Sequence, residues 1–311
     1  MEILKYTANG VIPVFLVIFV GIALNKLKFF SQTTKDEIVK LVFYVGTPCL
    51  IFANVAYSDI HNSFDLKFEI FVVIAILLTI ALMIALSSFI KEPAKKGAVV
   101  QIGYRSNFAI VGMPLALSLL DNEGVTLTAV TLSFVIITYN ITAVLLLSHY
   151  GQKQGNIKKT IKGILTNPLI IGTVTGLVFA VFKIPLFEIA SKTIDILGEI
   201  ASCMGLIVIG ATITLEGFKN NKKEIILSVF FRNALAPVFI LSLGILMGYR
   251  GNYLMTLAIM SCAPAAVNCF VMAKKMGVSP EISAYGVSIT SILSIVSIFV
   301  SIYILKITGL S

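Results

Sequence analysis

The chain has 311 residues, of which 58% are hydrophobic and only 13% are charged. Ordinary soluble domains are about 45–50% apolar and about 25% charged, and much of any chain of this size must lie at its surface. The composition therefore excludes a soluble enzyme, a disordered chain and a secreted disulfide scaffold, and it predicts an integral membrane protein. The formal net charge of +9 arises in short segments between apolar runs, so it indicates membrane topology rather than binding to nucleic acid.

A lipid-spanning helix needs about 20 mainly apolar residues, and the chain contains ten such runs. They cover roughly residues 8–28, 37–57, 68–90, 97–120, 124–148, 161–182, 193–215, 224–248, 253–273 and 279–306. We therefore expect an all-α integral membrane protein with ten transmembrane helices. The first run lacks a small-x-small cleavage site, so we expect a retained helix rather than a signal peptide.

Basic residues are unevenly divided between the two alternating sets of segments that join these runs. Sixteen of the 24 lysines and arginines lie in one set, which includes the segment 153–162, and six lie in the other. The positive-inside rule places the richer set in the cytoplasm. The sequence therefore predicts a multi-pass protein of the plasma membrane with both termini outside.

The longest hydrophilic interruption, from His149 to Lys162, divides the chain into two groups of five runs. An odd number of helices gives the two halves opposite orientations, as in the inverted repeats of transporters. We expect one five-helix repeat over 1–150, a short cytoplasmic loop over 151–160 and a second, inverted repeat over 161–311.

Pro114 and Pro264 lie in the fourth and ninth runs, which are counterparts in the two repeats. One proline in a membrane helix often does no more than kink it. Two prolines in counterpart helices, both among small and polar residues, predict paired broken helices, and such pairs indicate the binding site of a transporter. Irregular backbone at membrane depth is tolerated only where it is buried in protein or lines a cavity. We therefore expect the two helices to cross at breaks near the middle of the membrane.

The directions of these two helices make the breaks suitable for an anion. Each break begins a second half-helix, and the positive N-terminal ends of both would face one site. The candidate substrate-binding residues are Asn107, Gly112, Pro114, Pro264 and Asn268. The two asparagine amides can hydrogen bond to a carboxylate without adding fixed charge, although a bond between packed helices is the alternative role of each.

Three ionisable residues are expected at membrane depth, where such side chains are functional candidates. Arg105 and Arg232 could attract an anion from the cytoplasm, or they could extend to the inner headgroups. Glu199 could take part in proton coupling, or it could pair with Lys192 or lie in an outer vestibule. The four cysteines and two histidines form no cluster, so we expect no metal site and no cofactor, while proton or sodium coupling stays open.

Two further patterns indicate close packing of helices. Serines recur every three residues over 288–297, and glycines stand four apart at Gly172 and Gly176 and again at Gly244 and Gly248. Small residues let membrane helices approach each other closely. We expect these positions to form packing seams rather than ligand contacts.

The crossover motifs resemble those of a known family. The segment from Asn107 through Gly112 to Pro114 resembles the Asn-x-x-x-x-Gly-x-Pro motif in helix four of the auxin efflux carrier family, which includes plant PIN carriers and bacterial carriers of malate and malonate. The stretches 263–274 and 278–283 are similar to the family's helices nine and ten, and the prolines of helices two and six also fit. The resemblance covers essentially the whole chain.

This resemblance implies a ten-helix crossover fold, shared in outline with bile acid sodium symporters and sodium/proton antiporters. It further implies a scaffold of helices 1, 2, 6 and 7, a moving transport domain of helices 3–5 and 8–10, elevator-type alternating access and a homodimer. Plant members resemble each other in an aspartate and a lysine one turn apart in helix three, whereas residues 71–89 here contain no ionisable side chain.

We therefore expect a secondary active transporter of a small organic anion, with its site at the crossing of helices four and nine. The substrate would be a carboxylate such as an auxin-like acid, malate or malonate. The alternative is a sodium-coupled organic anion symporter of the bile acid type. No enzyme is expected, because clustered histidine, acidic or cysteine residues at membrane depth are missing. The expected partners are the substrate, membrane lipid and a second copy of the chain.

Overall fold

The computed structural model describes residues 13, 16–57, 65–151, 166–212 and 215–310, and the regular structure within these ranges is helical. A helix over Leu16–Lys26 comes first. The elements that follow are α2 (Gln32–Leu41), η1 (Val42–Gly46), α3 (Thr47–Ala56), α4 (Leu66–Leu86), α5 (Pro93–Tyr104), η2 (Phe108–Gly112), α6 (Met113–Leu119), α7 (Asn122–Tyr150), α9 (Pro168–Val181), α10 (Glu188–Thr212), α11 (Leu215–Asn220), α12 (Lys222–Phe230), η3 (Phe231–Leu235), α13 (Ala236–Leu246), α14 (Asn252–Cys262), α15 (Asn268–Met276) and α16 (Pro280–Ile307).

Six helical stretches in the described ranges are long and apolar enough to cross a membrane, namely Gln32–Ala56, Leu66–Leu86, Asn122–Tyr150, Glu188–Thr212, Lys222–Leu246 and Pro280–Ile307. Each of the ten predicted apolar runs overlaps helical structure, and large apolar side chains are exposed along many of the helices, as lipid contact requires. The prediction of an all-helical, multi-pass membrane protein is confirmed. Most of the predicted loop over 151–160 lies outside the described residues.

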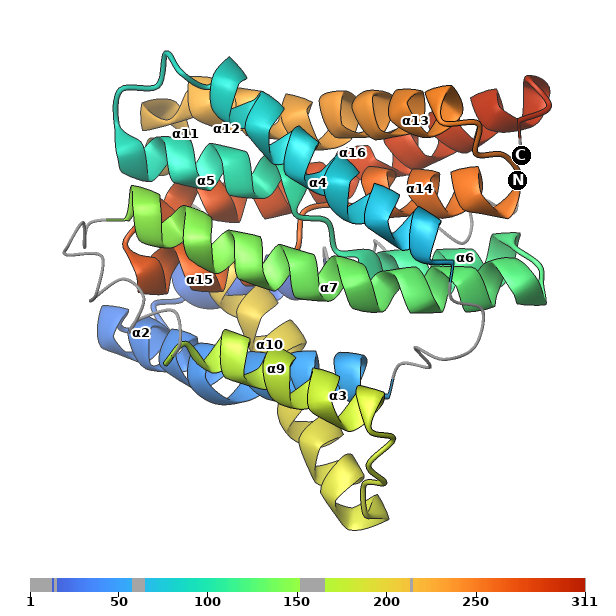
Figure 1. The fold of residues 1–311 in the computed structure, drawn as a ribbon. Helices are drawn as coiled ribbons and strands as arrows, with labels where there is room; N and C mark the ends of the chain where they lie inside the picture. Colours follow the sequence, from blue (N-terminus) through green and yellow to red (C-terminus); the bar gives the residue numbers. More distant parts are fainter. Residues whose placement is uncertain (1–12, 14–15, 58–64, 152–165, 213–214, 311) are drawn as a thin grey trace.

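The helices form two groups (Figure 1). In the smaller group, α3 packs against both α9 and α10, and α10 also contacts α2. The larger group contains α4 to α7, α11 to α14 and α16, and it encloses a hydrophobic core of its own. The helix α15 contacts α2 and α10 on one side and α16 on the other. A second hydrophobic core fills this seam and draws side chains from both groups.

Three π-helical turns precede three prolines with the same spacing. Pro48, Pro114 and Pro237 are each the second residue of the α-helix that follows η1, η2 and η3. Proline has no N–H group, and its ring clashes with the carbonyl four residues earlier, so a wider turn accommodates it without ending the helix. For Pro237 that carbonyl belongs to Asn233, and it accepts a hydrogen bond from the Ser297 hydroxyl at 2.9 Å.

Glycines allow α9 to approach the backbone of α3. A Cβ atom added to Gly172 would lie 2.7 Å from the carbonyl oxygen of Pro48, and one added to Gly176 would lie 3.0 Å from that of Phe52. The predicted packing role of this pair is confirmed. The packing role predicted for Gly248 is wrong, because it has φ +83° with no atom near its Cβ position, so it serves the turn after α13 instead.

The serine stripe of α16 packs as predicted. Ser288, Ser291 and Ser294 are buried, and each hydroxyl donates to a backbone carbonyl three or four residues earlier. These hydroxyls therefore satisfy their hydrogen bonds within the helix, and they leave a narrow face for close packing.

Candidate functional site

Two helices are interrupted, and their breaks cross. The first break, over residues 105–107, separates α5 from η2, and the second, over 263–267, separates α14 from α15. Ser106 and Ala265 form an isolated antiparallel bridge between the breaks. Two backbone hydrogen bonds hold the crossing, from the N–H of Asn107 to the carbonyl of Pro264 at 2.7 Å and from the N–H of Ala266 to the carbonyl of Arg105 at 3.1 Å.

The two prolines do not occupy equivalent places in these helices. Pro264 lies within the second break, as predicted. The prediction that Pro114 marks the first break is wrong, because this proline lies inside α6 and the π turn η2 accommodates it. The asparagines are the matching positions, since Asn107 immediately precedes η2 and Asn268 begins α15.

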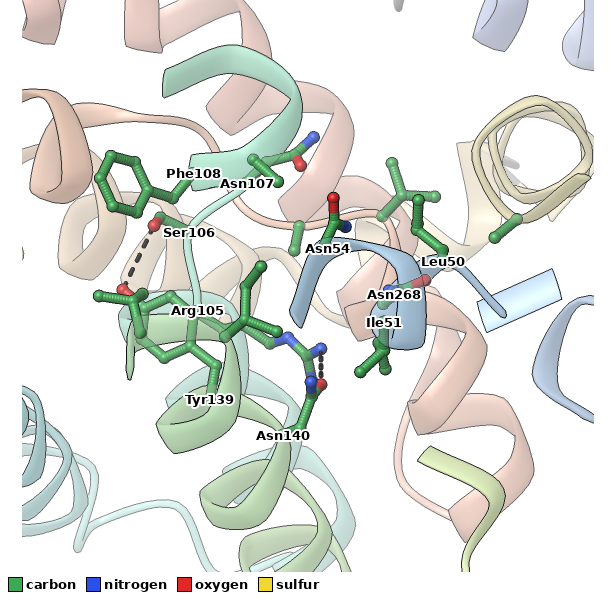
Figure 2. A pocket seen from close by; sticks show the side chains of 16 residues that line it. Leu50, Ile51, Asn54, Arg105, Ser106, Asn107, Phe108, Tyr139, Asn140 and Asn268 are labelled. Atoms are coloured by element: carbon green, nitrogen blue, oxygen red, sulfur yellow. Dashed lines mark hydrogen bonds between the residues drawn. The ribbon is translucent and has the colours of Figure 1, made fainter. Parts of the chain in front are cut away.

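A small cavity of about 60 Å³ lies beside the crossing (Figure 2). Both breaks contribute to its wall, together with α3, α7 and α10. Its polar lining residues are Asn54, Arg105, Ser106, Asn107, Tyr139, Asn140 and Asn268. The structure therefore brings three of the predicted residues, Asn107, Asn268 and Arg105, to one cavity.

The second half-helices begin at this cavity. Residues 107–109, at the start of η2, and residues 266–268, at the start of α15, line its wall. The first N–H groups of a helix have no partner within the helix, and the helix dipole places partial positive charge at the same end. Two helix N-termini beside one cavity therefore favour a negatively charged ligand.

Arg105 adds a full positive charge to the cavity wall. Its side chain is only 4% exposed, and its Nη2 donates to Oδ1 of Asn140 at 2.6 Å while Nη1 lies 2.8 Å from the sulfur of Met272. None of the ion pairs found among the described residues includes Arg105. A buried charge without a counter-ion is costly, so this guanidinium is suited to bind an anion from outside the chain.

Three asparagine side chains complete the polar wall. The amide of Asn107 is buried, and the hydrogen bonds of the described residues include none to it or to the amide of Asn54. The Asn268 Oδ1 atom accepts from the Thr47 hydroxyl at 3.3 Å, so this residue makes the helix-packing bond that we considered as its alternative role. Asn54 was not a predicted site residue, because a lone amide within an apolar run carries no local signal of its surroundings.

Gly112 and Arg232 lie outside the cavity wall. A Cβ atom on Gly112 would come within 2.4 Å of the Phe108 ring, so this glycine makes room for that ring. Arg232 is 1% exposed, and its guanidinium donates to the backbone carbonyls of Tyr104 and Ser261. Arg232 therefore contacts the ends of two broken helices rather than the headgroup region that a snorkelling side chain would reach.

Glu199 lies on an exposed face of α10, away from the crossing. Together with Asp195 it lines a second, more open cavity of about 580 Å³, which shares Asn54 with the smaller cavity. Of the alternatives for Glu199, the pairing with Lys192 is wrong, because Lys192 pairs with Glu188 one turn earlier, while the outer vestibule position stays a prediction.

A buried acid in α4 was missed from the sequence. Glu69 is 1% exposed, and its Oε1 accepts from the Thr131 hydroxyl at 2.9 Å, while Oε2 has no hydrogen-bond partner in the described part of the chain. The residue stands in the first turn of its helix close to Asp65 and Lys67. That charged neighbourhood is typical of a membrane surface, so the sequence alone did not indicate its burial.

Comparison with known proteins agrees with this architecture. The family model described as "Membrane transport protein" matches residues 7–302. A protein of Rhizobium meliloti (strain 1021) with the name "Putative malonate transporter" is 25% identical over 305 residues, which cover 95% of this chain and 95% of that protein. The chain therefore belongs to this family of membrane transport proteins, the auxin efflux carrier family that its motifs resemble, whose members are transporters and not enzymes.

Proposed function

We propose that the chain is a secondary active transporter of a small carboxylate, with its binding site in the cavity beside the crossing. The observation that carries this proposal is the buried Arg105, which has no acidic partner among the described residues and lies beside two helix N-termini. An anion would supply the missing negative charge. Asn107 and Asn268 would orient it through directional hydrogen bonds.

The size of the cavity favours a small substrate. A volume of about 60 Å³ accommodates a few water molecules, each of which needs about 10–15 Å³ on this measure, and pockets for drug-sized ligands reach about 300–1,000 Å³. A short dicarboxylate such as malonate or malate suits this space better than a bile acid does. The relative's name, "Putative malonate transporter", supports the same choice.

We further propose that the two groups of helices are the scaffold and the transport domain of an elevator mechanism. The helix over Leu16–Lys26 with α2, α3, α9 and α10 would form the scaffold, and α4 to α7 with α11 to α16 would move. The support is that the wall of the cavity draws residues from α3 and α10 of the smaller group and from both breaks and α7. The ten-helix inverted repeat, the homodimer, the plasma membrane location and the external termini are parts of the same proposal.

Binding measurements on the purified protein test the proposed site. Isothermal titration should detect malonate or malate, and it should detect little binding of malonamide, which has a similar shape but no charge. Asn107→Ala and Asn268→Ala should each weaken binding by about 10- to 150-fold, because a hydrogen bond to a charged group contributes about 1.5–3 kcal/mol. Asn122→Ala, at an exposed position of α7, is the control. Unchanged affinity in both cavity variants would place the site elsewhere.

A further inference from the structure

Arg232 joins the C-terminal ends of the two broken helices. It lies in the π turn η3, on a helix that belongs to neither break. Its Nη1 donates at 2.7 Å to the carbonyl of Tyr104, the last residue of α5, and its Nη2 donates to the carbonyl of Ser261, in the last turn of α14. One planar guanidinium thus satisfies a carbonyl at each of two helix ends that have no partners within their own helices.

The charges at this junction balance. Each helix C-terminus carries about −0.5 of an elementary charge, so two such ends together offset about one guanidinium. Arg232 is 1% exposed, and no acidic side chain in the described ranges forms an ion pair with it. A buried positive charge in this setting needs compensation, and the two helix ends supply it.

In transporters with broken helices, unwound carbonyls and half-helix C-terminal ends are the groups that coordinate a coupling cation. Here the guanidinium already occupies two of them. We propose that Arg232 is a permanent internal cation of the crossing, that it takes the place of a bound sodium ion, and that binding and transport of the anion therefore do not require sodium. The proposal rests on the proposed function, because it concerns how that transport is driven.

The neighbouring residues hold Arg232 in this place. The amide of Asn233 donates to the carbonyl of Thr290 at 3.2 Å, and the Ser297 hydroxyl donates to the Asn233 carbonyl at 2.9 Å. The Thr290 hydroxyl in turn accepts from the N–H of Ala265, within the second break, at 3.1 Å. Hydrogen bonds therefore connect η3, α16 and the crossing. They hold Arg232 in a fixed position relative to the second break, which follows the end of α14 that Arg232 contacts. Its guanidinium carries a positive charge throughout the physiological pH range.

The first test uses the unmutated protein without substrate. Thermal unfolding is followed in NaCl, KCl and choline chloride at equal ionic strength, and we expect one melting temperature in all three salts. A ligand that binds only the folded state raises its stability, so a rise specific to sodium would overturn the proposal. This result does not depend on the identity of the substrate. Malonate affinity measured in the same three salts should also be equal, and a requirement for sodium there would contradict the proposal in turn.

The second test removes the internal cation. Arg232→Ala should lower the melting temperature by about 5–10 °C, the shift expected for the loss of two charge-assisted hydrogen bonds in a chain of this size. It should also make stability depend on the salt, since sodium can then reach the vacated carbonyls. Arg250→Ala is the matched control, because Arg250 also donates to backbone carbonyls near a helix end, those of Ile245 in the last turn of α13 and Tyr249 after it, but is exposed.

Arg232→Lys keeps the charge without the planar fork, and it should restore part of the lost stability. It also serves as the folded variant if the alanine variant does not accumulate. An alanine variant as stable as the unmutated chain, or one equally stable in all three salts, would contradict the proposal, and so would a lysine variant no more stable than the alanine variant.

Discussion

Replacing Arg105 by glutamine should remove most of the affinity for the anion while the protein still folds. Arg105 is the one charged side chain among the described residues of the cavity wall. Removal of a hydrogen bond to a charged group costs about 1.5–3 kcal/mol, which weakens binding by about 10- to 150-fold. The Coulomb attraction of two unit charges about 4 Å apart, about 4 kcal/mol at an effective dielectric constant of 20, sets an upper limit.

The fold should tolerate this change because glutamine can replace one of the present contacts. Its amide can donate to Oδ1 of Asn140, the atom that now accepts from Arg105. Isothermal titration with malonate measures the affinity, and a thermal melt of the same sample establishes folding. Arg105→Lys should bind with intermediate affinity, because lysine keeps the charge and loses the forked donor geometry. Arg250→Gln, at an exposed position, should bind as the unmutated protein does.

An unchanged dissociation constant for Arg105→Gln, together with an unchanged melting temperature, would refute this reasoning. The guanidinium would then serve only its neighbours Asn140 and Met272, and the cavity would not select an anion by charge. If Arg105→Gln both binds weakly and melts at a lower temperature, the weak binding could result from lost charge or from poor folding. Arg105→Lys distinguishes these causes, because it should recover part of the affinity and part of the melting temperature.

Three further predictions concern packing, movement and orientation. Gly172→Ala should lower the melting temperature, because the new Cβ would lie 2.7 Å from a backbone oxygen of α3 and such overpacking costs about 1–3 kcal/mol. Asp36 of α2 and Lys274 of α15 form an ion pair at 2.8 Å. When both are replaced by cysteine and joined by a thiol-reactive crosslinker, transport should stop, and either cysteine alone should leave it unchanged. In a cysteine-free background, an impermeant reagent should label Arg250→Cys on intact cells and spare Lys222→Cys; the reverse pattern would invert the topology.

Most of the helical architecture could be predicted because a lipid bilayer restricts which backbone structures can cross it. Backbone groups in a bilayer must be paired within helices, so each crossing segment leaves a long apolar run in the sequence, and all ten predicted runs overlap helices. The location of the first break could not be predicted from its proline. Pro114 is conspicuous in the sequence, but a π turn absorbs it, and the break follows Tyr104 instead, where the sequence only changes from apolar to polar residues.

The roles of the two deep arginines show where sequence reasoning reached its limit. Arg105 and Arg232 stand in similar apolar runs, and the sequence left the same two roles open for both, attraction of an anion or extension to the inner headgroups. Arg105 lies at a cavity beside the start of two half-helices, whereas Arg232 contacts the ends of the two preceding half-helices, at Tyr104 and Ser261. Helix starts carry partial positive charge, and helix ends carry partial negative charge. The positive charge of Arg105 is therefore left for an anion to neutralise, whereas the positive charge of Arg232 neutralises the two helix ends. The residue type sets the charge, and only the backbone around it decides whether that charge is available to a substrate.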